Sequence, residues 1–113
     1  MSYFVSSTQS IPIFHVRDLF DEVKNRLLLA DIEQHIDKGS NRFIVDMSHI
    51  NVINSIGLNL LIGALKKCEQ SGGAMTVAGP SKSVLKLLEI TKLRKRFSVS
   101  TSLEEALKYI RKN

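Results

Sequence analysis

The stretch RFIVDMSHINVINSIGLNLLIGALKKCEQSGGAMTVAG, residues 42–79, predicts a strand, a helix and a second strand in that order. Residues 42–47 form a short apolar run rich in β-formers, which is typical of a buried parallel strand. Across 55–69 apolar side chains recur at helical spacing, and the next β-rich run covers 74–79. A helix between two such strands predicts α/β layering. The helical stripe consists of Leu58, Leu61, Leu65 and Cys68.

The flanking sequence continues the alternation of strands and helices. Because helices of about ten residues separate most strands, the chain is expected to fold as an α/β protein. Two strands follow each other at the N-terminus, so the sheet is predicted to be mixed but mostly parallel, with about four to six strands and about four helices. The further predicted strands are 2–7, 10–16 and 96–100, the further helices are 19–37, 81–90 and 102–112, and 50–53 is a short extended piece.

Two local features add detail to this prediction. Pro12 has no backbone N–H, so strand 10–16 is expected to lie at an edge of the sheet or to begin at that residue. Helix 19–37 is expected to bury a broad apolar face, with Gly39 placed to end it. The face combines Val23, Leu27 and Ala30 with Leu28, Ile32 and Ile36.

Length and composition indicate one soluble, globular domain over residues 1–113. The chain is 43% hydrophobic with a mean hydropathy of zero, and its 113 residues suffice for a single core. No apolar run approaches the roughly 18 to 20 residues of a membrane helix, and the N-terminus lacks the pattern of a secretory signal. With Cys68 as the one cysteine, a cytoplasmic protein is expected.

The formal net charge of +5 is partly local. Such a basic cluster can meet nucleic acid or anionic lipid, but a solvated surface is the commoner role. Aromatic side chains for stacking on bases are not interleaved with it, so we expect no nucleic-acid partner. The cluster consists of Lys92, Arg94, Lys95 and Arg96.

Signatures of catalysis and of metal binding do not occur in the sequence. It contains no G-x-S-x-G, no phosphate loop and no G-x-G-x-x-G. The histidines His15, His35 and His49 fall in three different elements without ligand spacing, and Cys68 lies on the core stripe. We therefore predict no catalytic residue, no metal, no cofactor and no enzyme activity.

The junction before helix 55–69 is the more informative place. Asn54 or Ser55 can cap the helix by accepting a backbone N–H. The junction also lies at the carboxyl edge of the predicted sheet, where partners commonly dock, and a phosphate is favoured at a helix N-terminus. Gly57 costs about 1 kcal/mol of helix propensity, which indicates close approach by a partner or by the chain itself. Ser55 is thus either a cap or a modified residue.

The order of these motifs resembles the STAS domain, a module of bacterial anti-sigma factor antagonists and of sulfate transporters. The family pattern has Asp-Leu-Ser after a strand and Asp-Ser-x-Gly-Leu at a helix start, which Asp46-Met47-Ser48 and Asn54-Ser55-Ile56-Gly57-Leu58 match here. Its ending is matched by LEITKL and SLEEAL, and the resemblance covers about residues 11–110. Asn54 stands where the family usually has Asp, and the basic cluster lies outside the pattern.

The resemblance implies a regulatory protein-binding module. In such antagonists a partner, which is both anti-sigma factor and serine kinase, phosphorylates the matching serine, here Ser55. The unphosphorylated form binds that partner, the phosphorylated form releases it, and a phosphatase resets the cycle. The surface that contacts the partner would consist of Asp46, Ser48, Asn51, Asn54, Ile56, Gly57, Leu58 and Asn59.

Two other functions remain open at this point. STAS domains also serve as accessory subunits of ABC-type transporters or of larger signalling assemblies. In that role no phosphorylation of Ser55 is needed, and the basic cluster would face a membrane or an ATPase. The third possibility is binding of a nucleotide or another small ligand at the carboxyl edge of the sheet.

Overall fold

A computed structural model describes residues 2–113, which form one five-stranded sheet and four helices. The strands follow the order β1-β2-β3-β4-β5, and only the β1–β2 pair is antiparallel. The prediction of a mixed, mostly parallel α/β fold is therefore confirmed. The elements are β1 (Tyr3–Thr8), β2 (Ile11–Val16), α1 (Glu22–Asp37), β3 (Arg42–Asp46), α2 (Ser55–Gln70), β4 (Ala74–Ala78), α3 (Lys82–Ile90), β5 (Val99–Ser100) and α4 (Leu103–Lys112).

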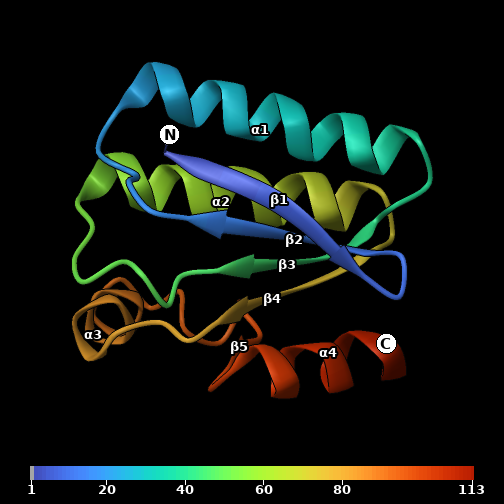
Figure 1. The fold of residues 1–113 in the computed structure, drawn as a ribbon. Coiled ribbons are helices and arrows are strands. Elements are labelled where there is room, and N and C mark those ends of the chain that lie inside the picture. The colour runs from blue at the N-terminus through green and yellow to red at the C-terminus, as the bar shows by residue number, and fades with distance from the viewer. Residues whose placement is uncertain (1) are drawn as a thin grey trace.

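The helices cover both faces of the sheet (Figure 1). α1 and α2 run beside each other on one face, where the larger core is built around Phe14, Phe43 and Val45. α4 packs on the other face, and its Ala106 and Ile110 meet a smaller core. Alternate residues of each strand point to opposite faces, so a central strand such as β3 supplies both cores.

The expectation of an edge position for the strand containing Pro12 is wrong, because β2 lies between β1 and β3. The backbone N–H of Arg17 donates to Ser2 O, so residues 2 and 17, which continue the pairing of β1 and β2, form a hydrogen-bonded pair. In an antiparallel pair of strands the two kinds of residue pair alternate, and Ser7 and Pro12 are therefore a pair without hydrogen bonds between them. Pairing with β3 begins only at Ile13. The missing N–H of Pro12 therefore interrupts neither ladder.

α1 differs from the prediction in its start and in its buried face. It begins at Glu22, because the Asp21 carboxylate caps it by accepting the backbone N–H groups of Val23 and Lys24. The broad apolar face is confirmed only in part: Leu28 and Ile32 are buried, but Val23 and Leu27 are 61% and 63% exposed. Since α1 is the outer helix of its layer, only one stripe of it meets protein (Figure 1).

Two predicted extended segments are shorter than expected. Residues 50–53 form no strand; they belong to an irregular loop in which the N–H of Ile50 donates to Met47 O. β5 comprises only Val99 and Ser100 instead of 96–100, because the preceding residues turn back onto the end of α3. There the backbone N–H groups of Leu93 and Arg94 both donate to the carbonyl of Leu88.

Candidate functional site

The first turn of α2 lies at the carboxyl edge of the sheet. β2, β3 and β4 all point toward this edge, which is on the left in Figure 1, and the loop 47–54 connects β3 to α2 there. In open α/β sheets this edge is where ligands and partners commonly bind. Ser55, the first residue of α2, therefore lies at the edge of the sheet where partners of such folds commonly bind.

Asn54, and not Ser55, caps α2. Its side-chain Oδ1 accepts the backbone N–H of Ile56 at 3.0 Å and that of Gly57 at 3.4 Å. Ser55 is the first helical residue and is exposed. Because Asn54 satisfies the helix end, the hydroxyl of Ser55 is not needed for capping and faces solvent.

Gly57 is explained by packing within the chain. It is buried, and a Cβ added to it would lie 3.0 Å from the Cβ of Ile53 and 3.2 Å from the Cβ of Leu19. These atoms are fixed to the backbone and have little freedom to move. The glycine therefore allows the first turn of α2 to sit against the loops before α1 and α2. Leu58 beside it is half-buried against the larger core.

Asp46 is a buried carboxylate, 2% exposed, below the surface of this loop. Its Oδ1 accepts the backbone N–H of Ser48 at 3.0 Å, and its Oδ2 lies 2.7 Å from His15 Nδ1. Burial by itself raises the pKa of Asp46, but the Ser48 hydrogen bonds and His15 outweigh it, so the pKa lies below the ordinary 3.8. The carboxylate thus holds the Ser48 turn in place. No local sequence pattern indicates that His15 is the partner of Asp46, because their contact depends on strand register.

The remaining residues of the predicted contact surface lie on or near the outside. Ser48, Asn51, Asn54 and Asn59 are exposed, and Ile56 is half-buried. The loop is tied to the next helix, since Ser81 Oγ donates to the carbonyl oxygen of Asn51 at 2.6 Å. The structure therefore brings the loop 47–54, the start of α2 and the start of α3 together on one edge.

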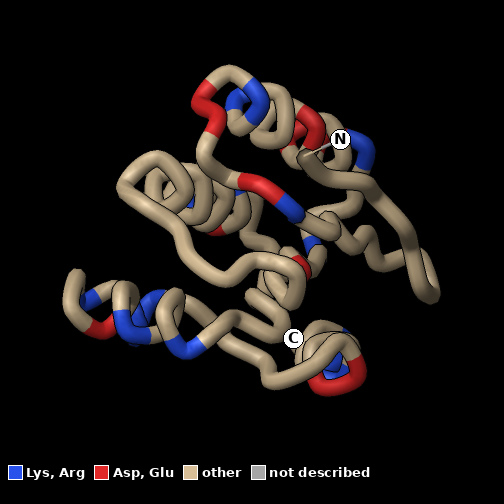
Figure 2. The backbone as a smooth tube through the Cα atoms, turned by 60° about the vertical axis from the view of Figure 1, so that its left-hand side comes forward, with Lys and Arg blue, Asp and Glu red and all other residues tan. Residues whose placement is uncertain are grey.

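The loop 47–54 and the start of α2 carry no charged side chain, whereas Arg17 and Asp18 border the neighbouring hollow and Lys82 begins α3. Residues 47–65 contain no Asp, Glu, Lys or Arg, and Figure 2 shows the corresponding loop and helix start as an uncharged stretch of backbone. Charged residues flank it at the start of α1, where Glu22 and Lys24 follow the cap residue Asp21. A phosphate added here would be the dominant local charge.

Two exposed apolar side chains, which no sequence motif singled out, lie next to the loop 47–54 and the start of α2. Phe20 and Val52 are 50% and 51% exposed, and both line a hollow of about 240 Å³ together with His49 and Asn51. A second hollow of about 220 Å³ separates α1 from α2 and includes Ile56 and Asn59. The hollow between the two helices depends on how α1 packs beside α2, and no local sequence pattern predicts that packing.

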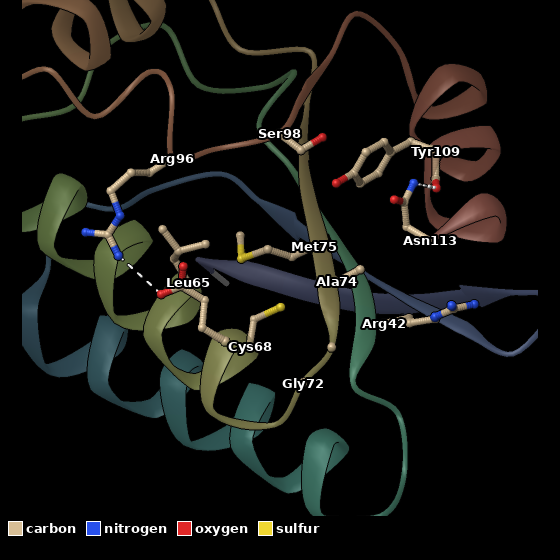
Figure 3. A pocket seen from close by; sticks show the side chains of 12 residues that line it. Arg42, Leu65, Cys68, Gly72, Ala74, Met75, Arg96, Ser98, Tyr109 and Asn113 are labelled. Atoms are coloured by element: carbon tan, nitrogen blue, oxygen red, sulfur yellow. Dashed lines mark hydrogen bonds and ion pairs between the residues drawn. The ribbon is translucent and has the colours of Figure 1, made fainter.

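Figure 3 shows another hollow, of about 410 Å³, at the opposite end of α2. It is bordered by the last turns of α2, the start of β4 and the end of α4, and Arg96 Nη2 lies 3.2 Å from Glu69 Oε1 on its rim. Cys68 lines it, but burial, aided by Glu69, raises the pKa of the thiol to about 11. The thiol is therefore protonated at neutral pH and is a core side chain, as predicted.

Across residues 2–113, no helix is long and apolar enough to span a bilayer. The same part of the chain holds no group of three or more His, Cys, Asp or Glu side chains arranged to bind a metal ion.

Several known proteins share this architecture. The crystal structure of TM1081 from Thermotoga maritima superposes with a TM-score of 0.86 at 20% identity, covering 96% of this chain and 94% of that chain. The unphosphorylated form of the anti-sigma factor antagonist SpoIIAA superposes with a TM-score of 0.79 at 19% identity, covering 98% and 97%. SpoIIAA has also been solved in its phosphorylated form, which gives a TM-score of 0.74.

Sequence comparison agrees with the structural one. A Thermotoga maritima protein named as an anti-sigma factor antagonist is 25% identical over 80 residues, or 71% of each chain. BtrV of Bordetella bronchiseptica, named in the same way, is 28% identical over 79 residues, or 70% of this chain and 68% of its own. The STAS domain model matches residues 5–106, and the chain therefore belongs to the STAS domain family, with relatives named as anti-sigma factor antagonists.

Proposed function

We propose that this protein is a cytoplasmic anti-sigma factor antagonist, that its whole chain acts as one module, and that Ser55 is its phosphorylation switch. In its unphosphorylated form it binds an anti-sigma factor that is also a serine kinase. The observation that carries the proposal is the exposed Ser55 hydroxyl at an uncharged helix start where Asn54 already provides the cap.

The same edge supplies a suitable contact surface. Ser48, Asn51 and Asn59 offer hydrogen-bonding groups, and Phe20 and Val52 add exposed apolar area beside them. Asp46 and Gly57 are buried and act indirectly: one fixes the Ser48 turn and the other lets α2 sit close to its neighbours. An uncharged surface of this kind is desolvated at low cost when a partner binds.

Phosphorylation would turn this uncharged surface into a negatively charged one. A phosphate on Ser55 adds about 1.5 to 2 negative charges to a stretch of chain that has none. The positive end of α2 stabilises that charge within the fold, so the domain stays folded while a close contact is lost. Ser55 is a substrate in this scheme. The base and the nucleotide belong to the kinase, and a separate phosphatase removes the phosphate.

The proposal is tested first by peptide mass spectrometry on the protein isolated from its own cells under several growth and stress conditions. Phosphate on the peptide that contains Ser55 is the expected result. A consistently unmodified Ser55 would contradict the switch and favour a role as an accessory subunit of a transporter or signalling assembly.

Binding to the kinase-type anti-sigma factor of the same organism is the second test. Ser55→Ala should bind as the unmodified protein does, whereas Ser55→Asp should bind about 30-fold more weakly or worse because a charge enters the contact. Gln70→Asp is a matched control, since it adds the same charge at an exposed position at the other end of α2. Equal loss in both aspartate variants would show a nonspecific charge effect.

A further inference from the structure

A chain of three hydrogen-bonded side chains crosses β1, β2 and β3 on the face that carries α4. Ser6 Oγ lies 2.8 Å from His15 Nε2, and His15 Nδ1 lies 2.7 Å from Asp46 Oδ2. Strand register produces this alignment: β2 and β3 pair His15 with Asp46, and β1 pairs Phe4 with His15, so Ser6 is two positions along the same face.

The direction of each proton in this chain follows from the chemistry of Asp46. An ionised carboxylate only accepts hydrogen bonds, so His15 Nδ1 must carry the hydrogen that it shares with Asp46. In the neutral imidazole Nε2 is then an acceptor, and Ser6 must donate its hydroxyl proton to it. A serine that donates to an imidazole oriented by a buried carboxylate is the arrangement that activates a nucleophile in serine hydrolases.

The imidazole is held firmly, and the serine faces outward. The Phe4 ring stacks on His15 with centroids 4.5 Å apart and planes 12° from parallel. The guanidinium of Arg17 lies 5.3 Å from the Phe4 centroid. The His15 side chain is only 12% exposed, whereas Ser6 is exposed. The oxygen that would react is therefore accessible while its base is positioned by packing.

β1 also leaves backbone donors free next to Ser6. It is an edge strand, and its alternation with β2 turns the N–H of Ser7 toward the open side of the sheet. The N–H of the residue after a nucleophile is a common donor to the oxyanion in acyl transfer. Ser6 is exposed and lines none of the hollows described above, so its hydroxyl is reached from the open surface.

We propose that Ser6 is a nucleophile that is acylated by small, activated carboxylic esters, with His15 as its base and Asp46 as the residue that positions His15. Ser6 Oγ forms a bond to the carbonyl carbon, and its proton moves to His15 Nε2. The bond from that carbon to the leaving oxygen breaks, and the leaving group departs with the electron pair and takes up the proton. Water then attacks the acyl-serine by the reverse proton route, which releases the carboxylic acid and restores Ser6.

This site does not rest on the Ser55 switch, because Ser6 lies on β1 and Ser55 begins α2, and the hydrogen bonds of Asp46 go to His15 and Ser48. The full chain is exposed to p-nitrophenyl acetate, and release of p-nitrophenolate is followed together with the acetyl group on the peptide that contains Ser6. We expect acetylation at Ser6 that is absent in Ser6→Ala. We also expect an at least about 100-fold slower reaction in His15→Asn, the contribution of a general base.

The His15→Asn variant is chosen because an asparagine amide can still donate a hydrogen bond to Asp46 while the base at Nε2 is lost. Thr8→Val serves as a control that should react as the unchanged protein does, because Thr8 is exposed on the same face of the same strand. Unreacted Ser6 in the unchanged protein overturns the proposal. So does equal acetylation in His15→Asn, since Ser6 would then react only because it is exposed.

Discussion

The two ends of α2 are built in opposite ways. At its start, Asn54 provides the cap, Ser55 is exposed and no charged side chain is near in sequence. At its other end, Lys67 pairs with Glu33 of α1 and Glu69 pairs with Arg96, so contacts from two other parts of the chain converge there. Contacts with two other parts of the chain hold the last turns of α2, its anchored end, in place, and its first turn, the presented end, is left accessible to a binding partner.

Two backbone segments also approach each other closely at the anchored end. The side-chain amide of Asn41 donates to Ser71 O at 3.1 Å, and the N–H of Ala74 donates to Asn41 O at 3.0 Å. Gly73 sits between these two contacts, where a Cβ would lie 1.9 Å from the Asn41 carbonyl oxygen. A carbonyl in the backbone cannot turn aside as a side chain can, so position 73 has no room for a side chain.

Gly73→Ala should produce the largest effect, because it attacks the anchored end directly. We expect the free energy of unfolding to fall by about 3 kcal/mol, since the added methyl must displace backbone. Urea unfolding followed by circular dichroism measures the change. Gly63→Ala is the matched control within α2: its Cβ would meet only the flexible end of Leu29, so the loss should be small or reversed by helix propensity. Equal losses in both variants would refute the argument.

Asp46→Asn tests the buried network below the presented end. At pH 7 we expect a loss of about 2 kcal/mol in the free energy of unfolding, because a charge-assisted acceptor of Ser48 and His15 is removed. The pKa of Asp46 is lower in the folded state, so its contribution is present above pH 3.8 and is lost as the pH falls through the folded value. Between about pH 5 and about pH 2, the free energy of unfolding of the variant should therefore change less than that of the unchanged protein. Identical acid profiles would count against the network.

Asn54→Ala should have the smallest effect of the three, because it removes only the cap of the presented end. A loss of about 1 kcal/mol is expected, since the N–H groups of Ile56 and Gly57 lose their acceptor. Ser55→Ala should leave the free energy of unfolding nearly unchanged in the same measurement. If Ser55→Ala were the more damaging of the two, Ser55 would be the structural residue and the comparison of the two helix ends would be wrong.

Local sequence rules predicted most of the secondary structure. The apolar runs in β3 and β4, the helical stripe ending at Cys68 and the helix predicted at 81–90 all correspond to elements of the structure. The predicted start of α1 was wrong, because periodicity does not distinguish a buried loop residue such as Leu19 from the helix that follows it. Periodicity also failed to predict that Val23 is exposed, because burial of a helix residue depends on which side of the helix has a neighbour.

The sequence by itself determined the order of elements, the α/β class and the position of Ser55 at a helix start, because spacing and capping act over a few residues. Only the tertiary structure decided that β2 is internal and that His15 meets both Ser6 and Asp46. These features depend on strand order and register, which join residues as far apart as His15 and Asp46. A register shift of one residue would turn each side chain to the opposite face, and the local pattern of a strand does not specify its neighbour's register.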